Sequence, residues 1–247
     1  MCGRFALFRD LTPLCEDLGA EDLSDPHAQP RWNIPPTVPI HVVTESVDKE
    51  SGAVLRALRT ARWGLLPPFA QDLAFGSRTF NARRETLIEK PSFRGCLGKY
   101  RALIPMDGYF EWKRTDSGAK QPFFIRPADG SALLTAALVT WWRGPGGHTG
   151  PAASPDGGYL LTATVITRQA GDVLGDIHDR APVMLRREVV DSWLDTAMSD
   201  AREAQAWIAD DTHLVPEDAL ELQEVDPAVG RVGVEGPTVL QPPQRLL

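Results

Sequence analysis

Strand-like segments recur along this chain, and they limit its possible folds more than any other feature. In each, apolar and polar residues alternate or β-branched and aromatic residues dominate, and prolines, glycines or charged residues separate the runs. They cover residues 39–44, 55–66, 101–113, 122–127, 133–142, 159–168 and 220–225. This pattern predicts a β-rich fold built around a curled sheet or a barrel.

Helical patterns are shorter than the strand-like ones. Residues 11–19 have Thr12 as a possible cap, Pro13 in the first turn and Gly19 at the end, and residues 80–86, 190–194 and 204–208 are also expected to be helical. We therefore expect one α+β domain over residues 1–229, with peripheral helices and a flexible Gly/Pro-rich loop at residues 144–158. Residues 230–247 are expected to form a C-terminal tail that lies on the surface or frays.

Charge is unevenly distributed along the chain. The net charge of −7 on its face disfavours nucleic acid as a partner. Residues 56–126, however, hold 14 Lys or Arg against 6 Asp or Glu, a local balance of +8. A basic middle can form a phosphate-binding face, although charges that are close in sequence can also disperse over the folded surface.

The cysteines and the apolar runs limit the classes of protein to which this chain can belong. Cys2, Cys15 and Cys96 are odd in number and lack metal-type spacing, which argues against a disulfide framework and against a zinc site. Cys15 shares an apolar helix face and is expected in the core. No apolar run approaches membrane-spanning length, and the N-terminus lacks the layout of a signal peptide. We therefore expect a cytoplasmic protein without metal, cofactor or membrane partner.

Cys2 directly follows the initiator Met1. Once Met1 is removed, a cysteine in this position carries a thiol and a free α-amine on one carbon. An α-amine has a reference pKa of about 7.7–8.0, so a usable fraction is neutral near pH 7. Such an amine can condense with an aldehyde as a Schiff base, and the thiol can then close a five-membered thiazolidine ring. The alternative is that Cys2 has no chemical role.

Three other places could contribute to a site, and each has a structural alternative. Glu111 lies between Phe110 and Trp112, where desolvation could suit it to acid/base catalysis, although alternation puts it on the opposite face and a solvent-facing side chain is the expectation. His178 sits among charged neighbours and could face a site or the surface. The Pro-rich stretch from Trp63 to Phe69 could stack on bases or fill the core.

The order of several motifs resembles the SOS response-associated peptidase (SRAP) family over roughly residues 2–225. These are Met1-Cys2-Gly3-Arg4-Phe5, Asn33-Ile34-Pro35-Pro36-Thr37, Trp63-Gly64-Leu65-Leu66-Pro67, Asn81-Ala82-Arg83, Lys90-Pro91-Ser92-Phe93, Asp107-Gly108-Tyr109-Phe110-Glu111-Trp112 and Ile177-His178-Asp179-Arg180-Ala181-Pro182. Members process abasic sites by crosslinking themselves to DNA, so the resemblance implies single-stranded DNA with abasic sites as the partner. It also implies a nucleoid-associated place in the SOS DNA damage response.

The resemblance implies a role for each matching residue. Cys2, freed of Met1 by self-cleavage, would attack the aldehyde of the open abasic sugar, in a protein that is both a cysteine peptidase and a lyase-like crosslinker. Asn81 would position the N-terminal residue and the sugar, Glu111 would move protons, and His178 would serve the sugar hydroxyl and crosslink reversal. The implied DNA contacts, to phosphates or flanking bases, are Arg4, Trp63, Phe69, Arg83, Trp112 and Thr167.

Three positions depart from the family pattern. Phe69 replaces a second tryptophan, which weakens a stacking wedge; Gly171 stands where an Asn is often found; and Ala181 replaces the usual Met. None of these departures touches Cys2, Asn81, Glu111 or His178.

Two other functions stay open, and we expect a monomer in each case. An N-terminal-nucleophile peptidase or amidohydrolase could use the same amine as the base for the Cys2 thiol on a small substrate. A non-covalent sensor of damaged or modified DNA would use the basic middle and leave Cys2 without a role.

Overall fold

Five strands close into a barrel in the computed structural model, which describes residues 2–48 and 50–243. The barrel strands are β4 (Pro39–Val47), β5 (Val54–Trp63), β7 (Arg101–Met106), β10 (Leu133–Trp142) and β11 (Leu160–Gln169). They are hydrogen-bonded in the order β11-β10-β7-β4-β5, and a parallel pairing of β5 with β11 completes the ring. Short strands extend the ring: β2 (Glu21–Asp22), β6 (Asn81–Arg83), β12 (Arg180–Pro182) and β13 (Met184–Leu185). The predicted barrel-like core is confirmed.

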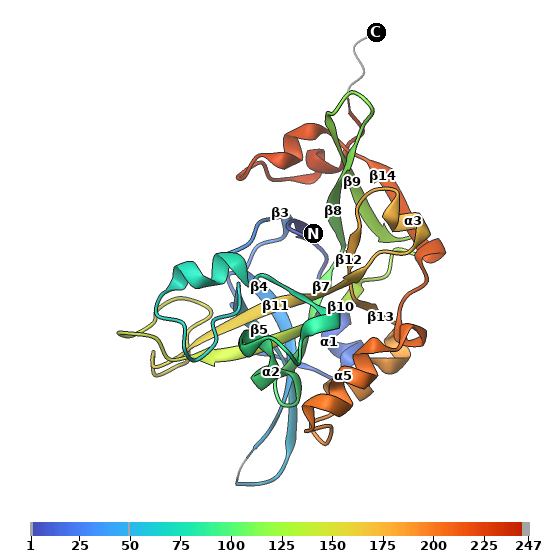
Figure 1. The fold of residues 1–247 in the computed structure, drawn as a ribbon. Coiled ribbons are helices and arrows are strands. Elements are labelled where there is room, and N and C mark those ends of the chain that lie inside the picture. Colours follow the sequence, from blue (N-terminus) through green and yellow to red (C-terminus); the bar gives the residue numbers. More distant parts are fainter. Residues whose placement is uncertain (1, 49, 244–247) are drawn as a thin grey trace.

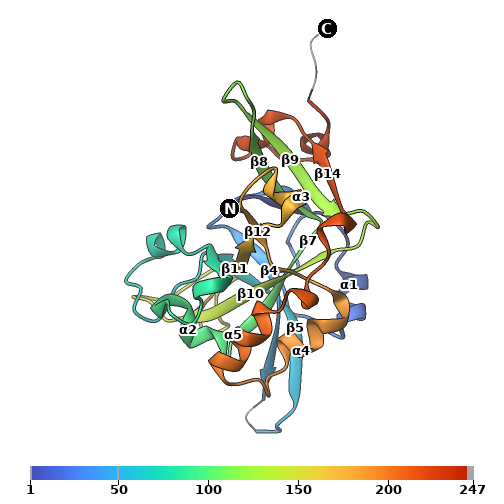
Figure 2. The ribbon, with the colours of Figure 1, turned by 45° about the vertical axis from the view of Figure 1, so that its right-hand side comes forward.

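A second antiparallel sheet stands over one end of the barrel (Figures 1 and 2). Its order is β14-β9-β8-β1-β3, with β1 (Phe5–Leu7), β3 (Arg31–Ile34), β8 (Gly108–Arg114), β9 (Lys120–Pro127) and β14 (Leu220–Glu224). Only Asp107 separates β7 of the barrel from β8 of this sheet. The chain therefore passes between the two sheets at Asp107-Gly108.

Helices cover the outside of the barrel. They are α1 (Thr12–Leu18), α2 (Pro91–Leu97), α4 (Val190–Leu194) and α5 (Ala201–Ala209), whereas the short α3 (Asp172–Gly175) contacts β12 near the second sheet. Phe93, Trp193 and Ile208 from these helices share one apolar cluster with residues of all five barrel strands, among them Val43, Leu58, Leu103, Leu138 and Ile166. The predicted α+β class with peripheral helices is confirmed. None of the helices in the described ranges is both long enough and apolar enough to cross a membrane.

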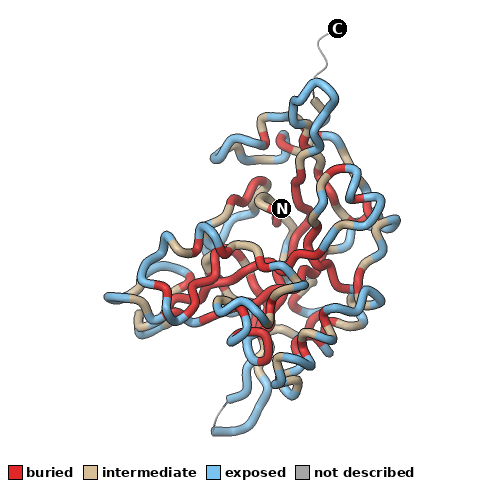
Figure 3. The backbone as a smooth tube through the Cα atoms, viewed as in Figure 1, coloured by how far each residue is buried: buried red, intermediate tan, exposed pale blue. Residues whose placement is uncertain are grey.

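The barrel interior contains a group of small side chains. Ala61, Ala102, Ala137 and Ala163 come from four different strands, are fully buried and belong to one cluster with Val42 of the fifth. Figure 3 shows the buried residues concentrated along these strands. Short side chains allow five strands to close tightly, and the larger Phe5, Trp63 and Tyr109 in the same cluster fill the end beneath the second sheet.

Three local expectations differ from the structure. Residues 81–83 are a strand, because Asn81 to Arg83 pair with β11, and only residues 84–86 are 3₁₀-helical. The first helix begins at Thr12 itself, so Leu11 occupies the N-cap position without a side-chain hydrogen bond, and the N–H of Thr12 donates to Asp10. The loop at residues 144–158 contributes Ala152 to a buried cluster with Trp142. In each case, a tertiary contact or a neighbouring side chain overrides the local preference.

The C-terminal tail is packed over the residues that the structure describes. Val239 is 2% exposed and lies in a cluster with Phe110 and Phe124. The carboxylate of Glu235 forms an ion pair with Arg31 at 2.9 Å and accepts hydrogen bonds from the backbone N–H groups of Trp32 and Asn33. This part of the tail is fastened to β3.

Candidate active site at the N-terminal segment

Cys2 lies between the barrel and the second sheet. Phe5 pairs with Tyr109, the N–H of Phe110 donates to the carbonyl of Arg4 at 2.9 Å, and the antiparallel register thus places Gly3 opposite Glu111. Cys2 is fully buried in the cluster that fills this end of the barrel. The start of the chain is therefore held as an extended segment beside β8, and Met1 lies outside the described residues.

Asn81 holds Cys2 in place. Its Nδ2 donates a hydrogen bond to the carbonyl of Cys2 at 2.7 Å. Asn81 is the first residue of β6 and pairs with Val165 of β11, so its position is set by the barrel. Its Oδ1 is buried and accepts no hydrogen bond from any described residue. This amide therefore has one group engaged with Cys2 and one acceptor available to a ligand.

Glu111 is buried beside Cys2, so the expectation of a solvent-facing side chain is wrong. Only 5% of the residue is exposed. Alternation does place it opposite Phe110 and Trp112, as predicted, but that face is the one that carries Tyr109 and receives the N-terminal segment. Strand alternation shows which side chains share a face of the strand. The packing of another segment decides whether that face is exposed to solvent.

Burial strongly raises the pKa of the Cys2 thiol, and the nearby carboxylate of Glu111 raises it further. Both effects disfavour the thiolate, because a charged sulfur would be desolvated and would face a second negative charge. The thiol is therefore protonated near neutral pH. Burial also raises the pKa of Tyr109, which shares the same face, and the charges of Cys2 and Glu111 add to this rise.

His178 lies on the loop between α3 and β12, and its side chain is 31% exposed. Its Nδ1 accepts a hydrogen bond from the N–H of Arg180 at 3.0 Å and also lies 2.8 Å from Asp179. One ring nitrogen cannot accept from Arg180 and donate to Asp179 at once, so the tautomer decides which contact is made. The adjacent Ile177 packs in the same cluster as Cys2.

Arg4 and Arg83 are cations near this site without a carboxylate partner among the described residues. Arg4 donates only to the carbonyls of Gly3 and Gly230, and its Nε is buried without a partner among the described atoms. Desolvation lowers its pKa. Arg83 is exposed at the end of β6, two residues from Asn81. Both could therefore bind an added anion.

The other implied DNA contacts divide by exposure. Phe69 is 55% exposed and contacts Phe75, and Trp112 is half-buried. Trp63 is fully buried, where its Nε1 donates to the carbonyl of Phe80 and its ring packs against Phe5. Thr167 is also fully buried, and its hydroxyl contacts Ala82 and Arg180. In this structure Phe69 and Trp112 are accessible to a strand, whereas Trp63 and Thr167 are not.

The basic middle is partly neutralised by folding. Arg56 forms ion pairs with Glu45 and Asp191, Arg84 with Asp211, and Arg126 with Glu221. These ion pairs offset part of the charge of the basic middle. No group of three or more His, Cys, Asp or Glu side chains within residues 2–48 and 50–243 is arranged to hold a metal ion.

An ion pair that sequence reasoning missed anchors the loop bearing His178. Arg168 donates to Glu217 at 2.7 Å, and Glu217 also accepts hydrogen bonds from the N–H groups of Gly171 and Leu174. A Cβ added at Gly171 would lie 2.9 Å from this carboxylate, so the glycine allows the close approach. Arg168 and Glu217 are far apart in sequence. The glycine at position 171, where the family often has Asn, was the only sign of this contact in the sequence.

Comparison with known proteins gives consistent results. The family described as SOS response associated peptidase (SRAP) matches residues 1–232. The abasic site processing protein YoqW of Bacillus subtilis is 35% identical over 202 residues, which are 81% of this chain and 83% of that protein. The abasic site processing protein YedK of Escherichia coli is 30% identical over 248 residues, covering 98% of this chain and 100% of that one.

Solved structures share the fold. A protein from Bacteroides thetaiotaomicron superposes with a TM-score of 0.77 at 20% identity, covering 98% of this chain and 100% of the other. A phage-related protein from Bordetella bronchiseptica gives a TM-score of 0.64 at 30% identity over 91% of this chain and 94% of the other. With the family match across nearly the whole sequence, these likenesses lead to one conclusion: the chain belongs to the SOS response associated peptidase (SRAP) family.

Proposed function

We propose that this protein recognises abasic sites in single-stranded DNA and joins itself to them through Cys2. The observation that carries the proposal is the setting of Cys2, whose carbonyl is held by Asn81 and whose thiol lies beside the buried Glu111. The relatives named as abasic site processing proteins support the choice of substrate.

The first step is removal of Met1. Hydrolysis of the peptide bond between Met1 and Cys2 consumes one water, releases methionine and leaves Cys2 with a free α-amine. Until that bond is cut, the nitrogen is an amide and cannot form a Schiff base. Self-cleavage would use the same thiol and carboxylate, since the Asn81 hydrogen bond already fixes the carbonyl of Cys2.

The second step forms the crosslink. The amine adds to the C1′ aldehyde of the open abasic sugar, and the resulting carbinolamine takes up a proton and loses water to give an iminium. The sulfur then attacks C1′, the C=N electrons return to nitrogen, and the thiol proton passes to a base. Amine, thiol and aldehyde thus give a thiazolidine and one water, with no change in oxidation state.

Glu111 is the base and acid that these steps require. Its carboxylate is close enough to Cys2 to raise the pKa of the thiol, so it can take the proton as sulfur attacks. The protonated thiol explains the order of events, because the amine must react first and create the electrophilic iminium. The buried Oδ1 of Asn81 can accept a hydrogen bond from the sugar, and His178 serves the sugar hydroxyl.

DNA binding would rely on the accessible groups around this site. Arg4 and Arg83 would contact phosphates, and Phe69 and Trp112 would stack on flanking bases. Trp63 would act indirectly, by supporting Phe5 and the loop that carries Phe69.

The test is incubation of the purified protein with a single-stranded oligonucleotide that contains one abasic site. We expect a denaturation-resistant adduct with wild type and none with Cys2→Ala, apart from a species that borohydride can trap. Cys15→Ala is the matched control and should crosslink normally. Intact mass, lower by one Met residue or not, reports whether Met1 has been removed.

Two outcomes would redirect the proposal. A wild-type protein without Met1 that forms no adduct over hours at neutral pH would exclude the crosslinking function. Turnover of a small amide that is insensitive to salt and to Arg83→Ala would favour a peptidase of the N-terminal-nucleophile type. An oligonucleotide with a tetrahydrofuran in place of the abasic sugar lacks the aldehyde and should bind without crosslinking.

A further inference from the structure

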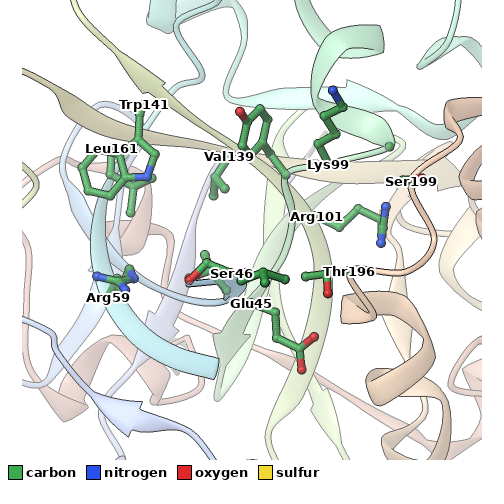
Figure 4. A pocket seen from close by; sticks show the side chains of 14 residues that line it. Glu45, Ser46, Arg59, Lys99, Arg101, Val139, Trp141, Leu161, Thr196 and Ser199 are labelled. Carbon is green, nitrogen blue, oxygen red and sulfur yellow. The ribbon is translucent and has the colours of Figure 1, made fainter. Parts of the chain in front are cut away.

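The barrel has a second end, remote from Cys2. Strand β7 runs from Arg101 at this end to Met106 beneath the second sheet, and the antiparallel β10 runs from Leu133 back to Trp142. A cavity of about 390 Å³ opens between the ends of β4, β7, β10 and β11 (Figure 4). This cavity is separated from the Cys2 site by the alanine-lined interior of the barrel.

The cavity continues the barrel interior with a change of chemistry. Val139 and Leu161 form a buried apolar base. Along β4, the inward positions change from Ile40 and Val42 to Thr44 and Ser46, so hydroxyl groups replace aliphatic ones at the opening. The volume is in the lower part of the range of small-molecule pockets, roughly 300–1,000 Å³. A ligand with both apolar and hydrogen-bonding surface would fit here.

Two exposed aromatic side chains line the opening. Tyr100 is 48% exposed and Trp141 is 42% exposed, although both adjoin buried residues of the same cavity. Large aromatic side chains are costly to leave in water, and their faces bind planar rings. The pair therefore favours a ligand with a planar ring over an aliphatic one.

The charge of the cavity is positive. Neither Arg59 nor Lys99 forms an ion pair with a described carboxylate. Glu45 also lines the cavity, but Arg56 binds it at 2.5 Å and offsets its charge. Arg101 donates four hydrogen bonds, to the carbonyls of Leu97, Trp193, Asp195 and Met198. A guanidinium has five N–H donors, so one remains for a ligand.

We propose that this cavity binds a nucleotide, with the base on Trp141 and the phosphate beside Lys99. Figure 4 shows Trp141 and Arg59 on one side and Lys99, Arg101 and Ser199 on the other. The aromatic base and the anionic phosphate of a nucleotide likewise lie at separate ends of the molecule. The remaining N–H of Arg101 and the hydroxyl of Ser199 complete the phosphate contacts, and Arg59 bonds to acceptor atoms of the base. The nucleotide is either free or the end of a strand.

The experiment measures calorimetric binding of thymidine monophosphate, thymidine and inorganic phosphate to the full chain. We expect the monophosphate to bind at least tenfold more tightly than either of the others. Trp141→Ala should weaken the monophosphate and thymidine by a similar factor. Lys99→Gln should weaken the monophosphate at least threefold and leave thymidine unchanged. Both residues are partly exposed, so the variants should fold.

Controls separate this cavity from the site at Cys2. Lys113→Gln removes an exposed cation from β8 and should leave nucleotide binding unchanged, and Cys2→Ala should also leave it unchanged. A 5′-phosphorylated tetrathymidylate that binds more tightly than the monophosphate identifies the source as a strand end, and the reverse order identifies a free nucleotide. Equal binding of thymidine and its monophosphate, or unchanged binding in both cavity variants, would overturn the proposal.

Discussion

Replacement of Asn81 tests whether the backbone of Cys2 must be held for the chemistry to proceed. The 2.7 Å hydrogen bond from Nδ2 is the side-chain contact that fixes the Cys2 carbonyl among the described residues. Asn81→Ala removes a hydrogen bond with a net value of about 0.5–1.5 kcal/mol and leaves a buried carbonyl unsatisfied, at a cost of about 1–3 kcal/mol. If water partly replaces the amide, about 1–3 kcal/mol is lost in all.

This loss of free energy sets the expected decrease in the crosslinking rate. Since each 1.36 kcal/mol is tenfold in rate, we expect crosslinking to slow by roughly 5- to 150-fold in Asn81→Ala. Asn81→Asp has nearly the same shape but places a carboxylate oxygen where Nδ2 now faces the carbonyl oxygen of Cys2. It should therefore be slower than the alanine variant, although it retains one oxygen for the sugar.

The assay is the single-turnover rate of adduct formation on a denaturing gel, with saturating protein that lacks Met1. Affinity for the tetrahydrofuran oligonucleotide and the melting temperature serve as controls. A loss of 1 kcal/mol in the free energy of unfolding lowers the melting temperature by about 2–4 °C in a chain of this size. Adduct formation by Asn81→Asp within twofold of wild type would refute the idea that Asn81 positions Cys2.

Three further predictions concern stability and DNA binding. Burial raises the pKa of Cys96 to about 12 from an ordinary value of 9.0. The stabilising contribution of this thiol is therefore complete below pH 9 and declines as the pH rises towards 12. Denaturant unfolding between pH 8 and 11 should show a smaller loss of unfolding free energy in Cys96→Ala than in wild type. Glu217→Gln breaks a nearly buried ion pair and should cost about 3 kcal/mol, whereas Glu221→Gln, in an exposed pair, should cost about 0.5 kcal/mol or less by thermal unfolding; equal costs would contradict this. Phe69→Ala should weaken binding to single-stranded DNA without changing stability. Trp63→Phe should lower stability by about 2 kcal/mol without a specific effect on DNA affinity. The reverse result in fluorescence titrations and melting curves would contradict the proposed roles of these two side chains.

The strands of this fold could be predicted because their patterns are local. Leu133 to Trp142 is a strand whatever its partners, whereas Asn81 to Arg83 become a strand only because β11 offers its edge. The same distinction separates the site residues. Cys2 could be selected from its position after Met1, but the burial of Glu111 depends on the N-terminal segment, which is about 110 residues away in sequence.

The limits of prediction at the proposed DNA contacts have the same physical origin. Trp63 and Phe69 belong to one motif, and composition gives no reason to bury the first and expose the second. Their difference follows from the alternation of β5, which turns Trp63 into the barrel, and from the loop that carries Phe69 beyond the last strand residue. Loop residues of this kind carry contacts that no periodic pattern can reveal.

The attachment of the tail to β3 has a consequence for how the protein is made. Asn33 donates to the carbonyls of Val229, Arg231 and Val234, so the sheet that receives Cys2 is completed by residues about 200 positions later. During synthesis the first residues leave the ribosome many seconds before these partners exist, at roughly 5–20 residues per second. A nascent chain therefore holds β3 without these partners until the tail has been made. Strand β3, although made early, can be fastened to the tail only late in synthesis.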